Sequence, residues 1–253
     1  MTRRLVVLAA FLLVVGCGGQ SGGANATSTP SQTTLTVFAA SSLKPAFDKV
    51  GARLQATKNV VPTFNYAGTQ TLTGQLQQGA PGDVFASADT AHMTTLQNAG
   101  LVSGSAKIFA HNSLEIAVSK GNPKGIHTLA DLSRAGLVVV LADPSVPAGK
   151  YAQQALAKAQ VTVHPASLEL QVTGVLTKVA LGEADAGIVY VSDIVTSGKV
   201  DGVTIPDSQN VIADYPVAVL KAAQNAAGAQ AFIDLVLSSD GQTILKAAGF
   251  QGV

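Results

Sequence analysis

Apolar residues from position 35 onward fall into two patterns, short continuous runs and stripes that repeat every three or four residues. Continuous runs predict buried strands, and stripes predict amphipathic helices. The predicted strands cover residues 35–38, 60–66, 84–86, 106–119, 137–141, 168–172, 186–191, 203–206 and 215–220. The predicted helices begin near residues 43, 72, 90, 128, 151 and 175, and two more lie within 228–249.

This alternation of strands and helices predicts the fold class. The valine-rich run at 137–141 is unbroken, which is typical of a strand covered on both faces and therefore of a parallel sheet. Repeated strand–helix units of this kind predict an α/β protein, in which ligands bind outside the carboxyl ends of the strands.

Four of the predicted helices begin directly where a strand ends. Ser41 and Ser42 lie at the first of these turns and Thr69 at the second, while residues 143–149 form the third and residue 172 follows the fourth strand. The first N–H groups of a helix have no intrahelical partner and carry partial positive charge, so they attract anions. A single serine in such a place is best interpreted as an N-cap. The fourfold recurrence instead favours an anion site.

The N-terminus carries a targeting signal. Residues 1–16 combine Arg3 and Arg4 with an apolar stretch of eleven residues at 5–15, too short to cross a bilayer and typical of a secretory signal peptide. The following Cys17, in VVGC, resembles the lipid-modified cysteine of bacterial lipoproteins. Residues 17–34 are rich in Gly, Ser and Thr and predict a flexible tether with a reach of about 20 to 25 Å. We therefore expect a lipid-anchored protein on the extracytoplasmic side of the cell membrane.

Composition excludes several classes of partner. The chain has 253 residues, 12% of them charged, and a net charge of +1 that becomes −1 without Arg3 and Arg4. It therefore has no electrostatic footprint for nucleic acid or an anionic membrane surface. Cys17 is the only cysteine, so no internal disulfide can form.

Enzyme chemistry has little support in the sequence. Asp83 and Asp89 could form an acid–base pair, but a turn or N-cap role is the favoured interpretation because no nucleophile or histidine pattern accompanies them. The chain contains no GxSxG, P-loop or GxGxxG motif. Its histidines lack the spacing of metal ligands and are expected to be surface or capped residues: His92, His111, His127 and His164.

Five segments carry a resemblance to a known family. In chain order they are TVFAASSLKPAF, AGTQTLTGQL, GAPGDVFASAD, DPSVPAGKYAQQAL and GIVYVSD. They are similar to segments of the molybdate-binding proteins of bacterial ABC importers, which have the class II periplasmic-binding-protein fold. The resemblance spans nearly all of residues 35–253.

The resemblance implies two α/β lobes, each with a mainly parallel central sheet flanked by helices, and a ligand cleft between them. Lobe I would comprise residues 35–112 plus 216–253, and lobe II residues 113–215. The lobes would close about a hinge near 112–114 and 215–216. It also implies a monomer without a cofactor, working with an ABC permease and its ATPase.

The resemblance also implies the site residues. Each site residue would supply a hydroxyl, a backbone amide or both to the oxyanion: Ser42 and Thr69 both groups, Ala148 and Val172 the amide, and Tyr190 the hydroxyl. Thr69 replaces a serine of the family, and the loop before Val172 differs in length from the family pattern. Tyr190 lies in an apolar strand, where its hydroxyl needs a partner.

Seven neutral donors can hold a tetrahedral dianion without a cationic side chain. Molybdenum would enter only as the oxyanion, with no direct protein ligation of a metal cation. Protonated phosphate would lack an acceptor, and among molybdate, tungstate and sulfate only cavity size remains as a discriminator. We therefore expect a binding protein for molybdate, and also for tungstate. A sulfate or other oxyanion binder is the alternative, and an enzyme on the same fold is a more distant one.

Overall fold

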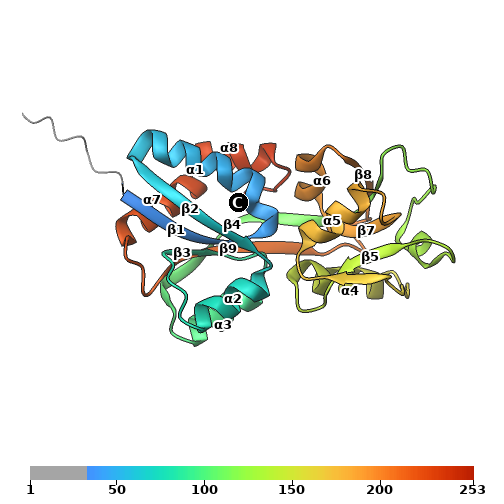
Figure 1. The fold of residues 1–253 in the computed structure, drawn as a ribbon, viewed down its shortest axis with the longest axis horizontal. Coiled ribbons are helices and arrows are strands. Elements are labelled where there is room, and N and C mark those ends of the chain that lie inside the picture. Colours follow the sequence, from blue (N-terminus) through green and yellow to red (C-terminus); the bar gives the residue numbers. More distant parts are fainter. Residues whose placement is uncertain (1–32) are drawn as a thin grey trace, which may run out of the picture. The chain divides into compact units, whose positions relative to one another are not determined.

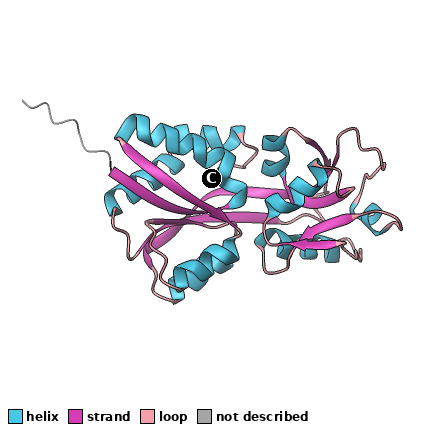
Figure 2. Ribbon diagram, viewed as in Figure 1, coloured by secondary structure: helices cyan, strands magenta, loops and turns pink. Residues whose placement is uncertain are grey.

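The structure, a computed structural model, describes residues 33–253, which lie within one compact unit. The predicted signal peptide and Cys17 lie outside the described residues. Strand β1 begins at Thr33, inside the predicted tether, because Thr33 and Thr34 continue the parallel pairing of β1 with β2. Figures 1 and 2 show two α/β lobes connected by two long strands.

Lobe I is built on three parallel strands. Strand β1 (Thr33–Ala40) lies between β2 (Val60–Ala67) and β3 (Val84–Ala86). Strand β9 (Ile212–Leu220) pairs antiparallel with β3 and with the first part of β4 (Val102–Ser119). The sheet of lobe I is therefore mixed, with its parallel strands at one side.

Lobe II has a second parallel group. Strand β5 (Val139–Ala142) pairs in parallel with β6 (Ser167–Glu169) and β7 (Ala186–Tyr190). The last part of β4 pairs antiparallel with β7 and with β8 (Val200–Thr204). Because β4 changes partner from β9 to β7 between Ser113 and Leu114, one strand serves both lobes. The predicted lobe boundaries near these positions stay a prediction.

Helices cover both faces of each sheet. In lobe I, α1, α7 and α8 pack on one face and α2 and α3 on the other (Figure 1). The helices are η1 (Ser41–Leu43), α1 (Lys44–Lys58), α2 (Thr69–Gln77), α3 (Thr90–Asn98), η2 (Leu129–Ser133), α4 (Pro147–Lys158), α5 (Val172–Ala180), α6 (Val191–Ser197), α7 (Ala226–Leu237) and α8 (Ser239–Ala247). Within residues 33–253 none of these combines the length and apolar character that a membrane span requires.

The first apolar stripe forms the centre of the lobe I core, as predicted. Leu43, Phe47, Val50 and Leu54 are completely buried. The Phe47 ring meets the ring of Phe232 in α7 edge to face, with 5.2 Å between centroids. This packing fixes the start of α1 against the sheet and so positions the turn at the end of β1.

Several element bounds differ from the prediction, and β4 and β9, for example, begin earlier, at Val102 and Ile212. Strand β5 begins two residues later than expected, because the N–H of Val138 donates to the Asp185 carboxylate rather than to a sheet partner, and Val138 is exposed. Strand β6 ends at Glu169, so Leu170 lies in a loop. Helix α6 was not predicted, since its sequence VSDIVTS has no helical stripe and many β-branched residues.

Candidate functional site

A small cavity lies where the two lobes meet. It admits the centre of a water-sized sphere over about 10 Å³, room for a single small group. The five residues predicted from the family resemblance all line it. The complete lining is Ala40, Ser41, Ser42, Ala67, Gly68, Thr69, Ala88, Val146, Pro147, Ala148, Val172 and Tyr190. The structure thus brings together residues that span 150 positions of the chain.

Four helices begin at this cavity without a side-chain cap. The first turns of η1, α2, α4 and α5 supply Ser42, Thr69, Ala148 and Val172, respectively. None of these four helices has a capping side chain or an acidic residue in its first turn. The orphan N–H groups of four helix starts therefore converge on one small space, where an anion can accept from them.

Other helices of the described region have a side-chain cap or an acidic residue at their N-terminus. Asp89 accepts from the N–H of His92 at the start of α3, Asn225 caps α7 and Ser238 caps α8. Helix α6 has Asp193 in its first turn. Missing caps are therefore confined to the helix starts at the cavity and to α1, which continues directly from η1. This contrast points to a ligand as the missing cap.

The Tyr190 hydroxyl is the only side-chain group in the cavity lining that is both fully buried and without a hydrogen-bond partner among the described residues. Tyr190 is 1% exposed. Burial raises the pKa of Tyr190 well above its ordinary value, so the phenol stays protonated. Its hydroxyl can therefore donate a hydrogen bond to a ligand. Within residues 33–253 no group meets this hydroxyl in hydrogen-bonding geometry, which leaves it available to a ligand.

Ser42 is held in place by a second tyrosine. Its Oγ lies 3.0 Å from the hydroxyl oxygen of Tyr215 on β9, and both residues are buried. Burial raises the pKa of Tyr215, so this hydroxyl is protonated and can donate to Ser42. Once Ser42 accepts from Tyr215, its own proton is free to point at a ligand.

Thr69 is arranged in the same way. Its Oγ1 accepts from the backbone N–H of Ala88 at 3.2 Å, and Thr73 Oγ1 donates to the Thr69 carbonyl oxygen. The Thr69 hydroxyl proton is therefore also free to donate. Since threonine takes this position without disturbing the lining, its additional methyl group is compatible with the cavity.

The cavity lining carries no charged side chain. Asp193 in α6 lies just outside this lining, and its carboxylate accepts from the N–H of Tyr190 at 3.1 Å. Burial raises the pKa of Asp193 to about 7. The cavity is therefore neutral by composition and positive only through the orientation of its N–H and O–H groups.

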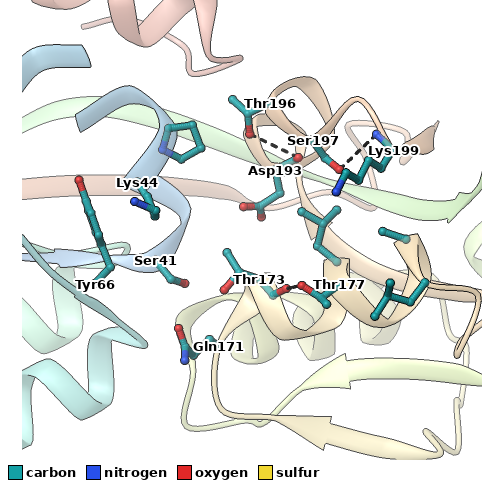
Figure 3. Close-up of a pocket in the computed structure, with 14 residues that line it drawn as sticks. Ser41, Lys44, Tyr66, Gln171, Thr173, Thr177, Asp193, Thr196, Ser197 and Lys199 are labelled. Carbon is teal, nitrogen blue, oxygen red and sulfur yellow. Dashed lines mark hydrogen bonds between the residues drawn. The ribbon is translucent and has the colours of Figure 1, made fainter. Parts of the chain in front are cut away.

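A larger groove lies beside the cavity and shares Ser41 with it. Its volume is about 620 Å³. Figure 3 shows Ser41, Lys44 and Tyr66 on one wall and Thr173 and Asp193 across from them. The Lys44 ammonium is paired with Asp48 at 2.9 Å. The groove is wide and mixed in chemistry, so it lacks the concentration of donors that defines the cavity.

The carboxylates considered for catalysis have structural roles. Asp83 accepts from the N–H groups of Thr36, Gln224 and Asn225, which ties β1 to the loop before α7. Asp89 caps α3 as predicted. In residues 33–253 no three His, Cys, Asp or Glu side chains gather as a metal site would require.

Two contributors to the site were missed in the sequence. Ala88 was assigned to a strand end without a function, although its N–H orients Thr69. Tyr215 was predicted only as part of a strand and a hinge. The sequence signal for Tyr215 was a tyrosine inside an apolar strand, the same signal that pointed to Tyr190.

Comparison with known proteins agrees with this geometry. Residues 35–251 match the family model described as bacterial extracellular solute-binding protein. The molybdate-binding protein ModA of Mycobacterium tuberculosis H37Rv is 42% identical over 240 residues, 94% of this chain and 92% of that protein. A Bacillus subtilis protein named as an ABC transporter substrate-binding lipoprotein, YvgL, is 26% identical, covering 97% of this chain and 96% of its own.

A solved structure has the same fold. The periplasmic molybdate-binding protein of Azotobacter vinelandii superposes with a TM-score of 0.76 at 20% identity, covering 85% of this chain and 98% of that one. The expected two-lobed α/β fold is thus confirmed. With a family model over most of its length and a close relative over nearly all of it, the chain belongs to the bacterial extracellular solute-binding proteins, in the family that includes the ModA proteins.

Proposed function

We propose that this protein captures molybdate, and also tungstate, and delivers it to the permease of an ABC importer. The observation that carries the proposal is the cavity where four uncapped helix starts meet the unpartnered Tyr190 hydroxyl. The family is one of solute-binding proteins rather than enzymes, and a relative with 42% identity is named for molybdate. Ser42, Thr69, Ala148, Val172 and Tyr190 are the proposed contacts.

The donor set favours a fully deprotonated oxyanion. The proposed contacts are hydroxyls and backbone N–H groups, and the hydroxyl oxygens of Ser42 and Thr69 each already take part in one hydrogen bond within the protein. Phosphate carries a proton near neutral pH, and the lining offers no carboxylate to accept it. Molybdate, tungstate and sulfate carry none. Discrimination among these three then depends on how well each fills the cavity.

Thermal unfolding with different anions tests the proposal. Molybdate or tungstate at 1,000 times its Kd should add about 4 kcal/mol to the free energy of unfolding. The melting temperature should therefore rise by about 8 to 16 °C. Sulfate and phosphate at the same ionic strength serve as controls and should give no comparable shift.

The anion series separates the candidate substrates. Stabilisation by sulfate alone would change the substrate and leave the donor-lined site in place. Stabilisation by none of the four anions would overturn the proposal.

Ser42→Ala should weaken molybdate binding about tenfold without abolishing it, because the backbone N–H remains while the hydroxyl donor is lost. Isothermal titration measures this change. Ser239→Ala, on α8 away from the cavity, is the matched control and should bind as the unaltered protein does. Equal affinities of the two variants would remove the Ser42 hydroxyl from the site.

The lipid anchor belongs to the same proposal. We propose that Cys17 carries the lipid and that the folded unit is tethered to the extracytoplasmic face of the cell membrane. The VVGC sequence after an apolar stretch supports this assignment, as does the lipoprotein relative from Bacillus subtilis. The permease and ATPase are proposed as partners on the basis of the family.

A further inference from the structure

One side chain bridges the two lobes next to the cavity. Gln70, the second residue of α2 in lobe I, donates from its Nε2 to the carbonyl oxygen of Leu170 in lobe II at 2.9 Å. Leu170 lies in the loop between β6 and α5, two residues before Val172. In the part of the chain that the structure describes, the other side-chain hydrogen bonds between the lobes involve the connecting strands β4 or β9.

The backbones of the two lobes also approach closely at this point. A Cβ atom placed on Gly68 would lie 2.4 Å from the Leu170 carbonyl oxygen. Gly68 has a φ of −59°, which any residue can adopt, so the need for glycine comes from space alone. The missing side chain lets the Leu170 carbonyl reach the start of α2, where Gln70 meets it.

The same side chain also has an unfavourable contribution to lobe closure. The Oε1 atom of Gln70 is fully shielded from solvent and has no hydrogen-bond partner. Separation of the lobes would expose this atom to water and remove its desolvation penalty. The contact is therefore suited to a reversible closure rather than to a permanent clamp.

We propose that Gln70 is a latch residue that sets how long the closed lobes retain the anion. The inference rests on the proposed function, because it requires an anion in the cavity. The contact exists only while the lobes are together, so its loss speeds opening and leaves the encounter with the open form unchanged. Gln70 is a positioning residue, since it does not line the cavity itself.

Stopped-flow measurement of molybdate binding and release tests the latch. Gln70→Ala should raise the dissociation rate constant about threefold to tenfold, which corresponds to the net worth of one hydrogen bond. The association rate constant should stay within about twofold. Gln77→Ala is the matched control, because Gln77 lies on the same helix with its side chain exposed. Equal dissociation rates in the two variants would overturn the latch.

Gly68→Ala provides an independent variant. Its Cβ would lie 2.4 Å from the Leu170 carbonyl oxygen and 2.6 Å from both amide atoms of Gln70, so it would break the bridge without removing either partner. The dissociation rate should rise, and adding Gln70→Ala in this background should raise it no further, since both changes remove the same contact. Independent, multiplying effects of the two substitutions would contradict a shared latch.

A measurement without ligand keeps this inference separate from the proposed function. Spin labels at Lys58→Cys and Leu181→Cys, with Cys17→Ser, report the distance between exposed positions on the two lobes. Gln70→Ala should shift the distance distribution toward longer values relative to Gln77→Ala. Identical distributions would reject the latch. Failure of molybdate to bind the unaltered protein would reject the proposed function, and the label distances would still show whether Gln70 holds the two lobes together.

Discussion

Val172→Pro is expected to lower the affinity for molybdate by about 10- to 100-fold while leaving the ligand-free fold intact. Val172 is the first residue of α5, a position where proline is well tolerated because its N–H has no intrahelical partner. The preceding Gln171 has φ −150° and ψ 143°, the extended conformation that a following proline requires. The substitution removes one N–H and also replaces the Val172 side chain, which is 3% exposed, so the stability of the ligand-free protein has to be measured beside the affinity.

The size of the effect follows from the charge of the ligand. A hydrogen bond to a charged group contributes about 1.5 to 3 kcal/mol, and each 1.4 kcal/mol is a factor of ten in affinity. Isothermal titration gives the affinity, and thermal unfolding without ligand shows whether the fold is kept. Both measurements are needed, because a destabilised α5 would also weaken binding.

Thr90→Pro is the matched control for this experiment. Thr90 is the first residue of α3, and the preceding Asp89 has φ −154° and ψ 164°. The same backbone change is thereby made at a helix start outside the cavity, where binding should be unaffected. Comparable losses of affinity in both variants would mean that proline acts on the fold, and the Val172 amide would no longer be a ligand donor.

The sequence was sufficient for the fold class and for a set of residues that meet at one cavity. Strand and helix periods are local properties, so β1, α1 and the turn between them could be predicted from residues 35–54 alone. The four helix starts at the cavity were predictable for the same reason, because a helix start is a local feature and the four shared one pattern. The five residues assigned by family resemblance all line the cavity.

Contacts between distant residues could not be read from the sequence. The Ala88 N–H that orients Thr69, the Tyr215 hydroxyl beside Ser42 and the bridge from Gln70 to Leu170 join residues 19, 173 and 100 positions apart. Each depends on how the sheets place strand ends side by side. Helix α6 was missed because its sequence has weak helical propensity, whereas Asp193 in its first turn accepts from the N–H of Tyr190 at the end of β7.

The mixed sheets also arise from long-range pairing. Each lobe keeps its parallel strands, β1 to β3 and β5 to β7, as the valine-rich runs indicated. The antiparallel pairs all involve β4 or β9, the strands that connect the lobes. The apolar pattern along a strand does not show whether that strand pairs in one sheet or in two.

Tyr190→Phe is expected to change stability and binding in opposite directions. The hydroxyl is buried without a partner in the ligand-free cavity, so its removal should stabilise that state by about 1 kcal/mol and raise the melting temperature by about 2 to 4 °C. The same removal deletes a donor to the dianion. Affinity for molybdate should therefore fall about 10- to 100-fold, because a hydrogen bond to a charged group is lost.

Higher stability combined with lower affinity would distinguish a binding role for the hydroxyl from a structural one. Thermal unfolding with and without molybdate measures both effects on one sample: the ligand-free melting temperature should rise while the ligand-induced shift shrinks. Tyr151→Phe on α4 is the matched control, since Tyr151 lies outside the cavity lining. A drop in ligand-free stability of Tyr190→Phe would show that the hydroxyl has a partner within the protein. A rise in ligand-free stability together with a fall in affinity would identify the Tyr190 hydroxyl as a donor to the oxyanion, because a purely structural hydroxyl would lower both when removed.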